Sequence, residues 1–97
     1  MQTYMTLLKW TSQGVQNVKQ SASRLEAAQK SFESAGARIK DFYMVTGQYD
    51  LVAIIEAPDD IVLAKVMLTL GLQGNLTSET CRAFTENEYR QIIGGLG

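Results

Sequence analysis

The hydrophobic pattern of this 97-residue chain changes its period several times, and these changes restrict the folds that it can adopt. Strand-like segments, with alternating or β-branched apolar residues, occupy residues 3–10, 37–46, 49–57 and 75–84. Apolar residues at three- and four-residue steps predict helices over residues 15–35 and 61–72. The predicted order is therefore strand, helix, strand, strand, helix, strand.

Turn and capping residues support these boundaries. Gly36 follows the first helix, where glycine readily takes the left-handed conformation that ends a helix. Gly47 and Gln48 lie between two strand-like segments and predict a tight hairpin turn. Asp59 or Asp60 can accept hydrogen bonds from the first free amides of the second helix.

A further short helix is predicted at the C-terminal end. Thr85 and Glu88 have the spacing of a capping box, which indicates a helix at residues 85–93 followed by a frayed tail at residues 94–97. The remaining βαββαβ order is typical of an α+β, ferredoxin-like domain, here spanning residues 1–97. We expect a four-stranded antiparallel sheet with both long helices on one face.

The sheet in this arrangement has one face without helices. Apolar or aromatic side chains lie on both sides of the first two strands, and the sequence leaves open which side meets the helices: Tyr4, Met5, Leu7, Leu8, Trp10, Phe42, Tyr43 and Met44. An open face of this kind would be a larger apolar patch than a soluble monomer usually exposes. We therefore expect a homo-oligomer, at least a dimer, in which two sheets pack face to face.

Composition excludes several classes of function. The net charge is −1, with 9 Lys and Arg against 10 Asp and Glu, so the chain lacks the basic excess of a nucleic-acid-binding protein. There are no histidines and one cysteine, which removes histidine-based catalytic triads, zinc sites and haem ligation. No metal, cofactor or internal disulfide is expected. No signal peptide or membrane-length apolar segment is evident, and the expected location is the cytoplasm.

The segment 41–60, with Gly47, Tyr49 and Asp50 at its hairpin, resembles the GYD family, whose small bacterial members share a Gly-x-Tyr-Asp-like signature there. Residues 71–75 and 80–86 are also similar to the family. The resemblance implies a dimeric α/β barrel and implies little about activity. A similar hairpin occurs in the ligand-sensing domain of leucine-responsive transcription regulators, where small amino acids bind between subunits.

Four residues are candidates for ligand binding or for the subunit interface. Tyr49 and Asp50 can present a phenol and a carboxylate to a ligand, or they can stabilise the turn that Gly47 permits. Arg82, if it faces a partner sheet, needs an anion such as Glu56, Glu79 or a ligand carboxylate. Two other side chains are expected to be structural: Cys81 as a small buried residue and Arg24 as a solvated one on the first helix.

These observations favour a non-catalytic protein that binds or senses a small molecule at a subunit interface. One alternative is a cofactor-free, monooxygenase-like enzyme for a small aromatic substrate. Its cavity between the sheets would be lined by Tyr4, Leu8, Trp10, Phe42, Tyr43 and Met44. The other alternative is a purely structural assembly protein. No catalytic residue is assigned, because the chain offers few acid–base groups at these positions.

Overall fold

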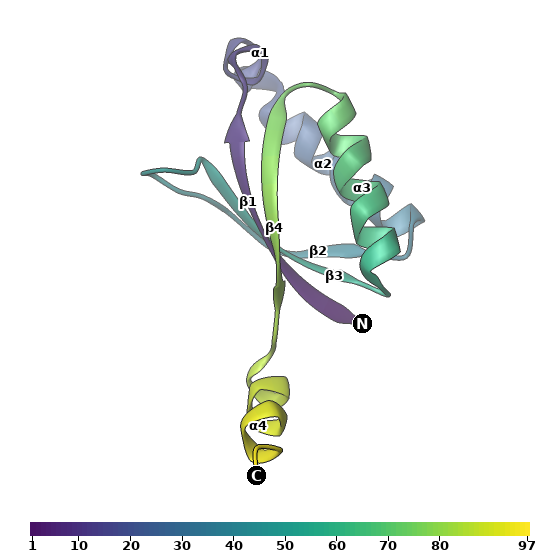
Figure 1. The fold of residues 1–97 in the computed structure, drawn as a ribbon. Coiled ribbons are helices and arrows are strands. Elements are labelled where there is room, and N and C mark those ends of the chain that lie inside the picture. The colour runs from purple at the N-terminus through teal and green to yellow at the C-terminus, as the bar shows by residue number, and fades with distance from the viewer.

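A computed structural model describes residues 1–97 as one sheet, two long helices against it and shorter helical segments (Figure 1). In chain order the elements are β1 (Gln2–Trp10), α1 (Ser12–Gln16), the 3₁₀ turn η1 (Val18–Gln20), α2 (Ser21–Ser34), β2 (Arg38–Met44), β3 (Leu51–Ala57), α3 (Asp60–Leu72), β4 (Leu76–Ala83) and α4 (Glu86–Gly94). The predicted βαββαβ order with a terminal helix is confirmed.

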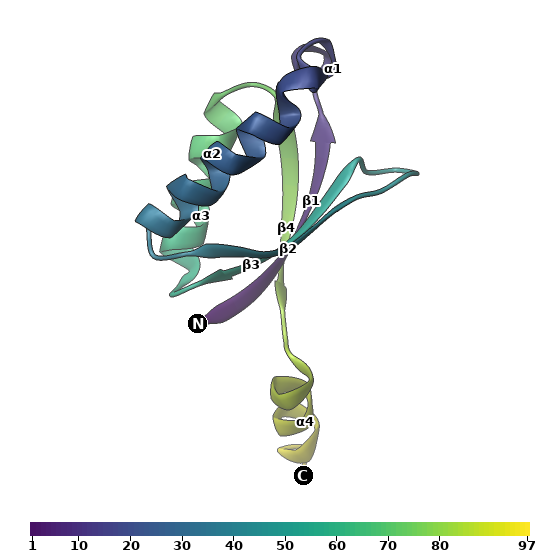
Figure 2. The same cartoon turned by 180° about the vertical axis from the view of Figure 1, so that it is seen from behind.

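The four strands form a single antiparallel sheet in the order β2-β3-β1-β4, which is the ferredoxin-like arrangement. Helices α2 and α3 lie side by side against one face of this sheet, and the opposite face carries no helix (Figures 1 and 2). The α+β class and the sheet are as predicted. We call the two sides of the sheet the helix-facing side and the open face.

The core lies between the helices and the helix-facing side. Its fully buried apolar residues are Tyr4, Leu8, Phe32, Ala37, Leu51, Ala53, Ile55, Ala57, Leu63 and Val66. Thr6 is buried among them, and its hydroxyl lies 3.1 Å from that of Thr80 on the adjacent strand. Because every second residue of β1 and β3 is buried here, the choice that the sequence left open is settled: Tyr4 and Leu8 meet the helices.

The first predicted helix is wrong in its continuity, because residues 12–34 form three segments. Thr11 caps α1 by accepting a hydrogen bond from the Gly14 amide at 3.1 Å. The chain then leaves the α-helical conformation at Asn17, where φ is −105° and ψ is 20°. The Asn17 carbonyl accepts bonds from the Gln20 amide and the Arg24 side chain, and these stabilise the bend.

The β2–β3 segment differs from the prediction in two ways. The pairing of β2 with β3 shifts between Ile39 and Asp41, which indicates a β-bulge at this point. Strict alternation therefore fails, and Ile39 and Phe42 both pack on the core. The prediction of a tight two-residue turn is also wrong, because residues 45–50 form a longer loop between β2 and β3. A hydrogen bond of 2.8 Å from the amide of Val45 to the carbonyl of Asp50 closes this loop.

Helix α4 stands apart from the rest of the fold, beyond the end of β4 (Figure 1). Its predicted capping box is confirmed: Thr85 and Glu88 exchange hydrogen bonds of 3.0 and 3.2 Å. Asp59 caps α3 in a similar way, through a bond of 2.9 Å from the amide of Val62. None of these helices has the length and apolar character required to cross a membrane.

Candidate functional site

The open face carries the exposed apolar surface of the sheet. Met5 and Leu7 of β1 lie opposite Ile54 and Val52 of β3, and Tyr43 of β2 is paired with Val52. All five side chains retain solvent contact, and Tyr43 is 58% exposed. We call Met5, Leu7, Tyr43, Val52 and Ile54 the open-face cluster.

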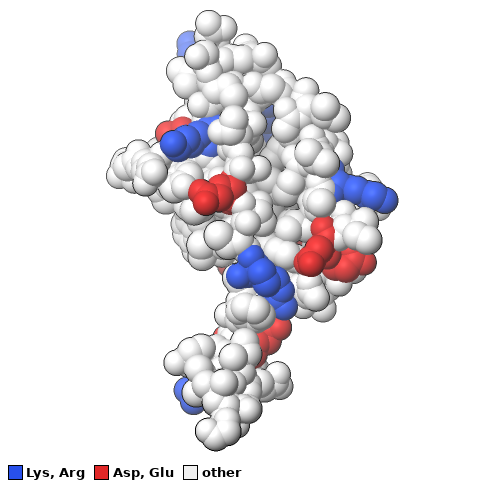
Figure 3. All heavy atoms as spheres, viewed as in Figure 1, with Lys and Arg blue, Asp and Glu red and all other residues white.

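Cys81 of β4 pairs with Met5 and extends the open-face cluster to the edge of the sheet. The prediction that Cys81 is buried is wrong, because it lies on the helix-free face and is exposed. Figure 3, viewed as in Figure 1, shows a mostly uncharged surface on which the charged side chains gather in a few small groups.

Tyr49 lies at the border of this face and contacts two charged residues. Its hydroxyl donates a hydrogen bond to a carboxylate oxygen of Glu79 on β4. The Lys9 ammonium lies 5.4 Å from the centroid of the Tyr49 ring, within cation–π range. The bond to Glu79 raises the pKa of Tyr49 above its ordinary value. The hairpin thus brings a phenol, a carboxylate and an ammonium together beside the open-face cluster.

Asp50 and Gly47 both stabilise the conformation of the loop between β2 and β3. The Asp50 carboxylate accepts a hydrogen bond of 3.0 Å from the amide of Trp10, and the Asp50 amide donates to the carbonyl of Leu8 at 2.9 Å. These bonds tie the loop to the end of β1. Gly47 has a φ of +109°, a conformation that side chains disfavour.

Arg82 lies on the helix-facing side at the edge strand, because it pairs with Tyr4. Its guanidinium forms a 3.1 Å ion pair with Glu88 and lies 4.7 Å from the centroid of the Phe84 ring. The expectation that Arg82 pairs with Glu56 or Glu79 is wrong. Glu56 forms an ion pair with Arg38, and Glu79 accepts a hydrogen bond from the Tyr49 hydroxyl.

The hydrogen bonds around Glu88 also set its protonation. The bond from the Thr85 amide, with a further one from Arg82, lowers the pKa of Glu88. Arg82 and Glu88 thereby join β4 to the start of α4.

Tyr4 is the most strongly perturbed titratable group. Burial, and then a hydrogen bond donated to Asp60 on α3, raise its pKa to about 12. The hydroxyl also lies 2.6 Å from the side-chain oxygen of Gln2. Tyr4 therefore connects β1 to the first turn of α3 as a neutral phenol.

Most of the residues expected to line a cavity between two sheets lie elsewhere in the structure. Tyr4 and Leu8 are core residues on the helix-facing side, and Trp10 and Phe42 pack against the same core. Tyr43 lies on the open face. Met44 pairs with the buried Leu51 at the end of β2 and is 70% exposed. The β-bulge lies before these residues, so Phe42, Tyr43 and Met44 still alternate relative to one another as the sequence predicted, while Ile39 is shifted out of that phase.

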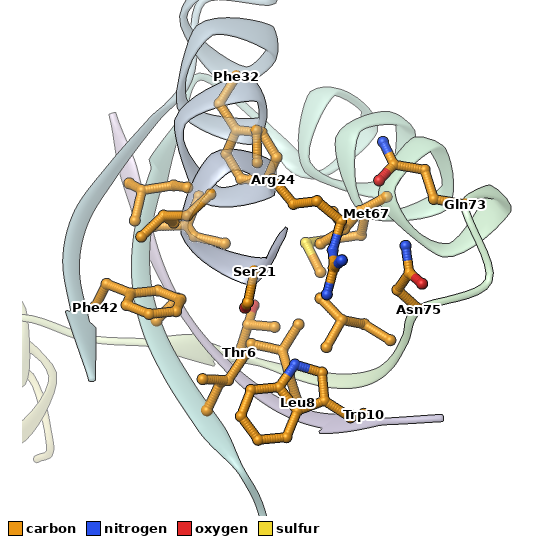
Figure 4. A pocket seen from close by; sticks show the side chains of 18 residues that line it. Thr6, Leu8, Trp10, Ser21, Arg24, Phe32, Phe42, Met67, Gln73 and Asn75 are labelled. Atoms are coloured by element: carbon orange, nitrogen blue, oxygen red, sulfur yellow. The ribbon is translucent and has the colours of Figure 1, made fainter. Parts of the chain in front are cut away.

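A cavity of about 50 Å³ lies instead within the chain, between α2, the end of α3 and the helix-facing side of the sheet (Figure 4). Hydrophobic side chains make up 13 of its 18 lining residues. The polar lining residues are Thr6, Ser21, Arg24, Gln73 and Asn75. The indole nitrogen of Trp10 is buried and has no hydrogen-bond partner.

Sequence reasoning missed this cavity because its polar residues come from distant segments. Arg24 was expected to be solvated, yet it is half-buried and lines the cavity. The available signal was its position on α2 beside Leu25 and Ala28, which also line the cavity. Groups of three or more acidic, cysteine or histidine residues that could hold a metal ion are absent from the structure.

The four-stranded sheet with its helix-free face defines a ferredoxin-like α+β domain. The chain belongs to the GYD domain family, whose model matches residues 4–93. It is 30% identical over 84 residues to the glutamine synthetase and cystathionine beta-lyase binding protein of Thermus thermophilus. That alignment covers 86% of this chain and 88% of the relative.

Two solved structures are similar. The crystal structure of TTHA0845 from Thermus thermophilus has a TM-score of 0.55 and 28% sequence identity, and the match covers 88% of this chain and 95% of that one. The crystal structure of MtbAldR has a TM-score of 0.68 at 13% identity. The match covers 88% of this chain and only 54% of MtbAldR, so this likeness concerns the fold alone.

Proposed function

We propose that this protein is a non-catalytic binding protein that works as a homo-oligomer, at least a dimer, in the cytoplasm and binds a small molecule at a subunit interface. The observation that carries the proposal is the open face, where the open-face cluster adjoins the Tyr49, Lys9 and Glu79 side chains. Apolar surface favours association, and charged groups at its border can select a ligand.

A second copy is the natural cover for the open face. Met5 is 39% exposed, and Leu7, Val52 and Ile54 are half-buried, so a facing sheet removes apolar surface from water along two central strands. Packing through a two-fold axis covers both copies with the same patch. The sheets then meet face to face, as in a dimeric α/β barrel.

The border of the open face supplies polar groups of both signs. Lys9 can pair with a carboxylate, and Glu79 can pair with an ammonium, while Tyr49 can donate or accept a hydrogen bond. A small zwitterion such as an amino acid complements this set. A ligand bound between subunits would replace the contacts of Tyr49 with Glu79 and Lys9 by contacts between these side chains and the ligand.

The state of the titratable groups supports binding over catalysis. Each residue with a shifted pKa is held by an internal hydrogen bond: Tyr4 by Asp60, Tyr49 by Glu79, and Glu88 by Arg82 and Thr85. A general acid or base needs a free position beside its substrate. These groups are used in holding elements together.

A second candidate function is the binding of a partner enzyme. The relative that is 30% identical is named for binding glutamine synthetase and cystathionine beta-lyase. The outer side of α3 exposes Ile61, Leu68 and Leu72, the last at 87%, which is a second apolar surface outside the open face. Pull-down of purified glutamine synthetase by this chain, with Leu68→Lys as the variant expected to lose it, tests this candidate.

Native mass spectrometry of gently purified protein tests the main proposal. We expect a dimer or a higher multiple at micromolar concentration, and we expect Ile54→Lys to convert it to monomer because a charge enters the apolar contact. Val15→Lys, at an exposed valine of α1, is the matched control and should leave the subunit count unchanged. A monomeric wild-type protein contradicts the proposal.

The ligand is tested by the same measurement in the presence of amino acids. Added mass on the oligomer that disappears in the Glu79→Gln variant supports a site at the border of the open face. An intact oligomer that binds no amino acid at millimolar concentration supports the purely structural alternative.

A further inference from the structure

We propose that the cavity between α2, α3 and the sheet is a second binding site, which takes a small apolar monocarboxylate with its charged end at Arg24 and Trp10. This site lies within one chain, on the side of the sheet opposite the open face. It is therefore separate from the subunit-interface site proposed above.

The indole nitrogen of Trp10 marks the polar end of the cavity. Its N–H group is buried without an acceptor, a state that costs free energy and is uncommon in native proteins. Figure 4 shows this nitrogen on the edge of the ring that faces the cavity, on the same side as the Arg24 side chain. A ligand oxygen placed there would satisfy the donor.

The positive charge of Arg24 favours a negatively charged oxygen as the ligand atom beside the Trp10 indole nitrogen. Its guanidinium has five N–H donors, and one contact, 2.7 Å to the carbonyl of Asn17, is made within the chain. The three ion pairs of the structure use the other arginines Arg38, Arg82 and Arg90, so Arg24 has no carboxylate partner. A carboxylate supplies both the negative charge and the acceptors that these two side chains lack.

The rest of the ligand must be apolar. Leu8, Leu25, Phe42, Met67 and Leu70 are among the hydrophobic side chains that line the cavity. The cavity of about 50 Å³ exceeds the roughly 10–15 Å³ that a single water molecule requires. A short alkyl or aromatic body gains free energy by leaving water for these walls.

The single tryptophan of the chain is the reporter for this site. We would titrate the protein with straight-chain monocarboxylates from propanoate to octanoate and follow tryptophan fluorescence, with hexanol as the uncharged control. We expect a saturable change with hexanoate and at least tenfold weaker binding of hexanol. Arg24→Gln should weaken hexanoate binding at least tenfold, because a charge-assisted bond is lost.

Matched variants separate a binding role from a structural one. Arg24→Lys keeps the charge and should retain part of the affinity, whereas Arg90→Gln on α4 should leave it unchanged. Ala28→Leu places a larger side chain at the wall and should abolish binding without changing the charge. Trp10→Phe, followed by calorimetry, removes the N–H donor while keeping an aromatic ring, and it should weaken hexanoate binding.

The proposal is overturned if no acid gives a saturable change at millimolar concentration, if hexanol binds as tightly as hexanoate, or if Arg24→Gln binds like the wild type. Repeating the titration on Ile54→Lys keeps the two proposals distinct. Because the cavity belongs to one chain, binding of hexanoate should survive in this variant whatever its subunit count.

Discussion

At the scale of single residues, Asp50 is an anchor for the hairpin loop. Its carboxylate accepts a hydrogen bond from the amide of Trp10. The Asp50 backbone makes two more bonds, because its amide donates to the carbonyl of Leu8 and its carbonyl accepts from the amide of Val45. We expect Asp50→Ala to lower the free energy of unfolding by about 1–3 kcal/mol, the cost of leaving an amide without its acceptor. Asp50→Asn keeps an acceptor and should lose less.

Urea unfolding measures this effect, with Tyr49→Phe as the neighbouring control. The Tyr49 hydroxyl bonds to Glu79 on an exposed surface, so its removal should change stability little. Equal stability of Asp50→Ala and the wild type would contradict the structural role of Asp50 and strengthen its assignment as a ligand-binding group.

Tyr4 makes stability depend on pH in the alkaline range. Its pKa is about 12 in the folded chain and about 10 in an unfolded chain. Between these values the unfolded state loses the proton while the folded state keeps it, so the free energy of unfolding falls as pH rises. We expect unfolding midpoints measured from about pH 9 to 12 to fall more steeply for the wild type than for Tyr4→Phe.

Tyr89→Phe on α4 is the control for the alkaline series, because Tyr89 is exposed at 58%. It should follow the wild-type curve. Parallel curves for the wild type and Tyr4→Phe would mean that the Tyr4 hydroxyl is not held in a buried position beside Asp60 in solution.

At the scale of elements, two glycines in helices should respond oppositely to substitution by alanine. A Cβ atom at Gly14 of α1 would lie 2.1 Å from the carbonyl oxygen of Asn75, whereas one at Gly71 of α3 meets nothing within 4 Å. Gly14→Ala should therefore destabilise the protein by roughly 1–3 kcal/mol through overpacking. Gly71→Ala should stabilise it by roughly 0.5–1 kcal/mol.

Thermal and urea unfolding of the two variants provide the comparison. Each variant is the other's control, since both introduce the same methyl group into a helix. A stable Gly14→Ala protein would show that α1 can move away from the loop before β4, to which Thr11 also bonds through its hydroxyl.

The sequence predicted the elements well because period and capping are local properties. The capping residues Thr85 and Asp59 were found in this way. The bulge between Ile39 and Asp41 was not predicted, because it depends on the pairing of β2 with β3. The bend at Asn17 was also missed, because the helical spacing of apolar residues continues across it. Sequence alternation gives two faces for a strand, and only packing determines which face meets the helices.

The candidate site was predictable in part for the same reason. Tyr49 and Asp50 were recognised from one hairpin motif, whereas their partners Glu79 and Trp10 lie on other strands. The cavity at Arg24 depends on how α2 and α3 lie over the sheet, and no local pattern contains that information.

At the scale of the whole molecule, the chain is a thin, two-layered body with an arm. Its extents are 53 × 32 × 17 Å, and α4 accounts for the elongation in Figure 1. A two-layered domain protects only one face of its sheet. Both the open face and the arm are therefore surfaces on which a second copy can pack.

Helix α4 provides the last prediction, because an isolated helix of 9 residues is marginal in water even with a capping box. Tyr89, Ile92 and Ile93 are 58%, 48% and 49% exposed, so its apolar side lacks a cover within the chain. We expect this side to pack on another copy. Ile92→Lys should lower the subunit count or the association constant at least tenfold in sedimentation, whereas Gln91→Lys on the same helix should not. Identical sedimentation of both variants and the wild type would show that α4 takes no part in assembly.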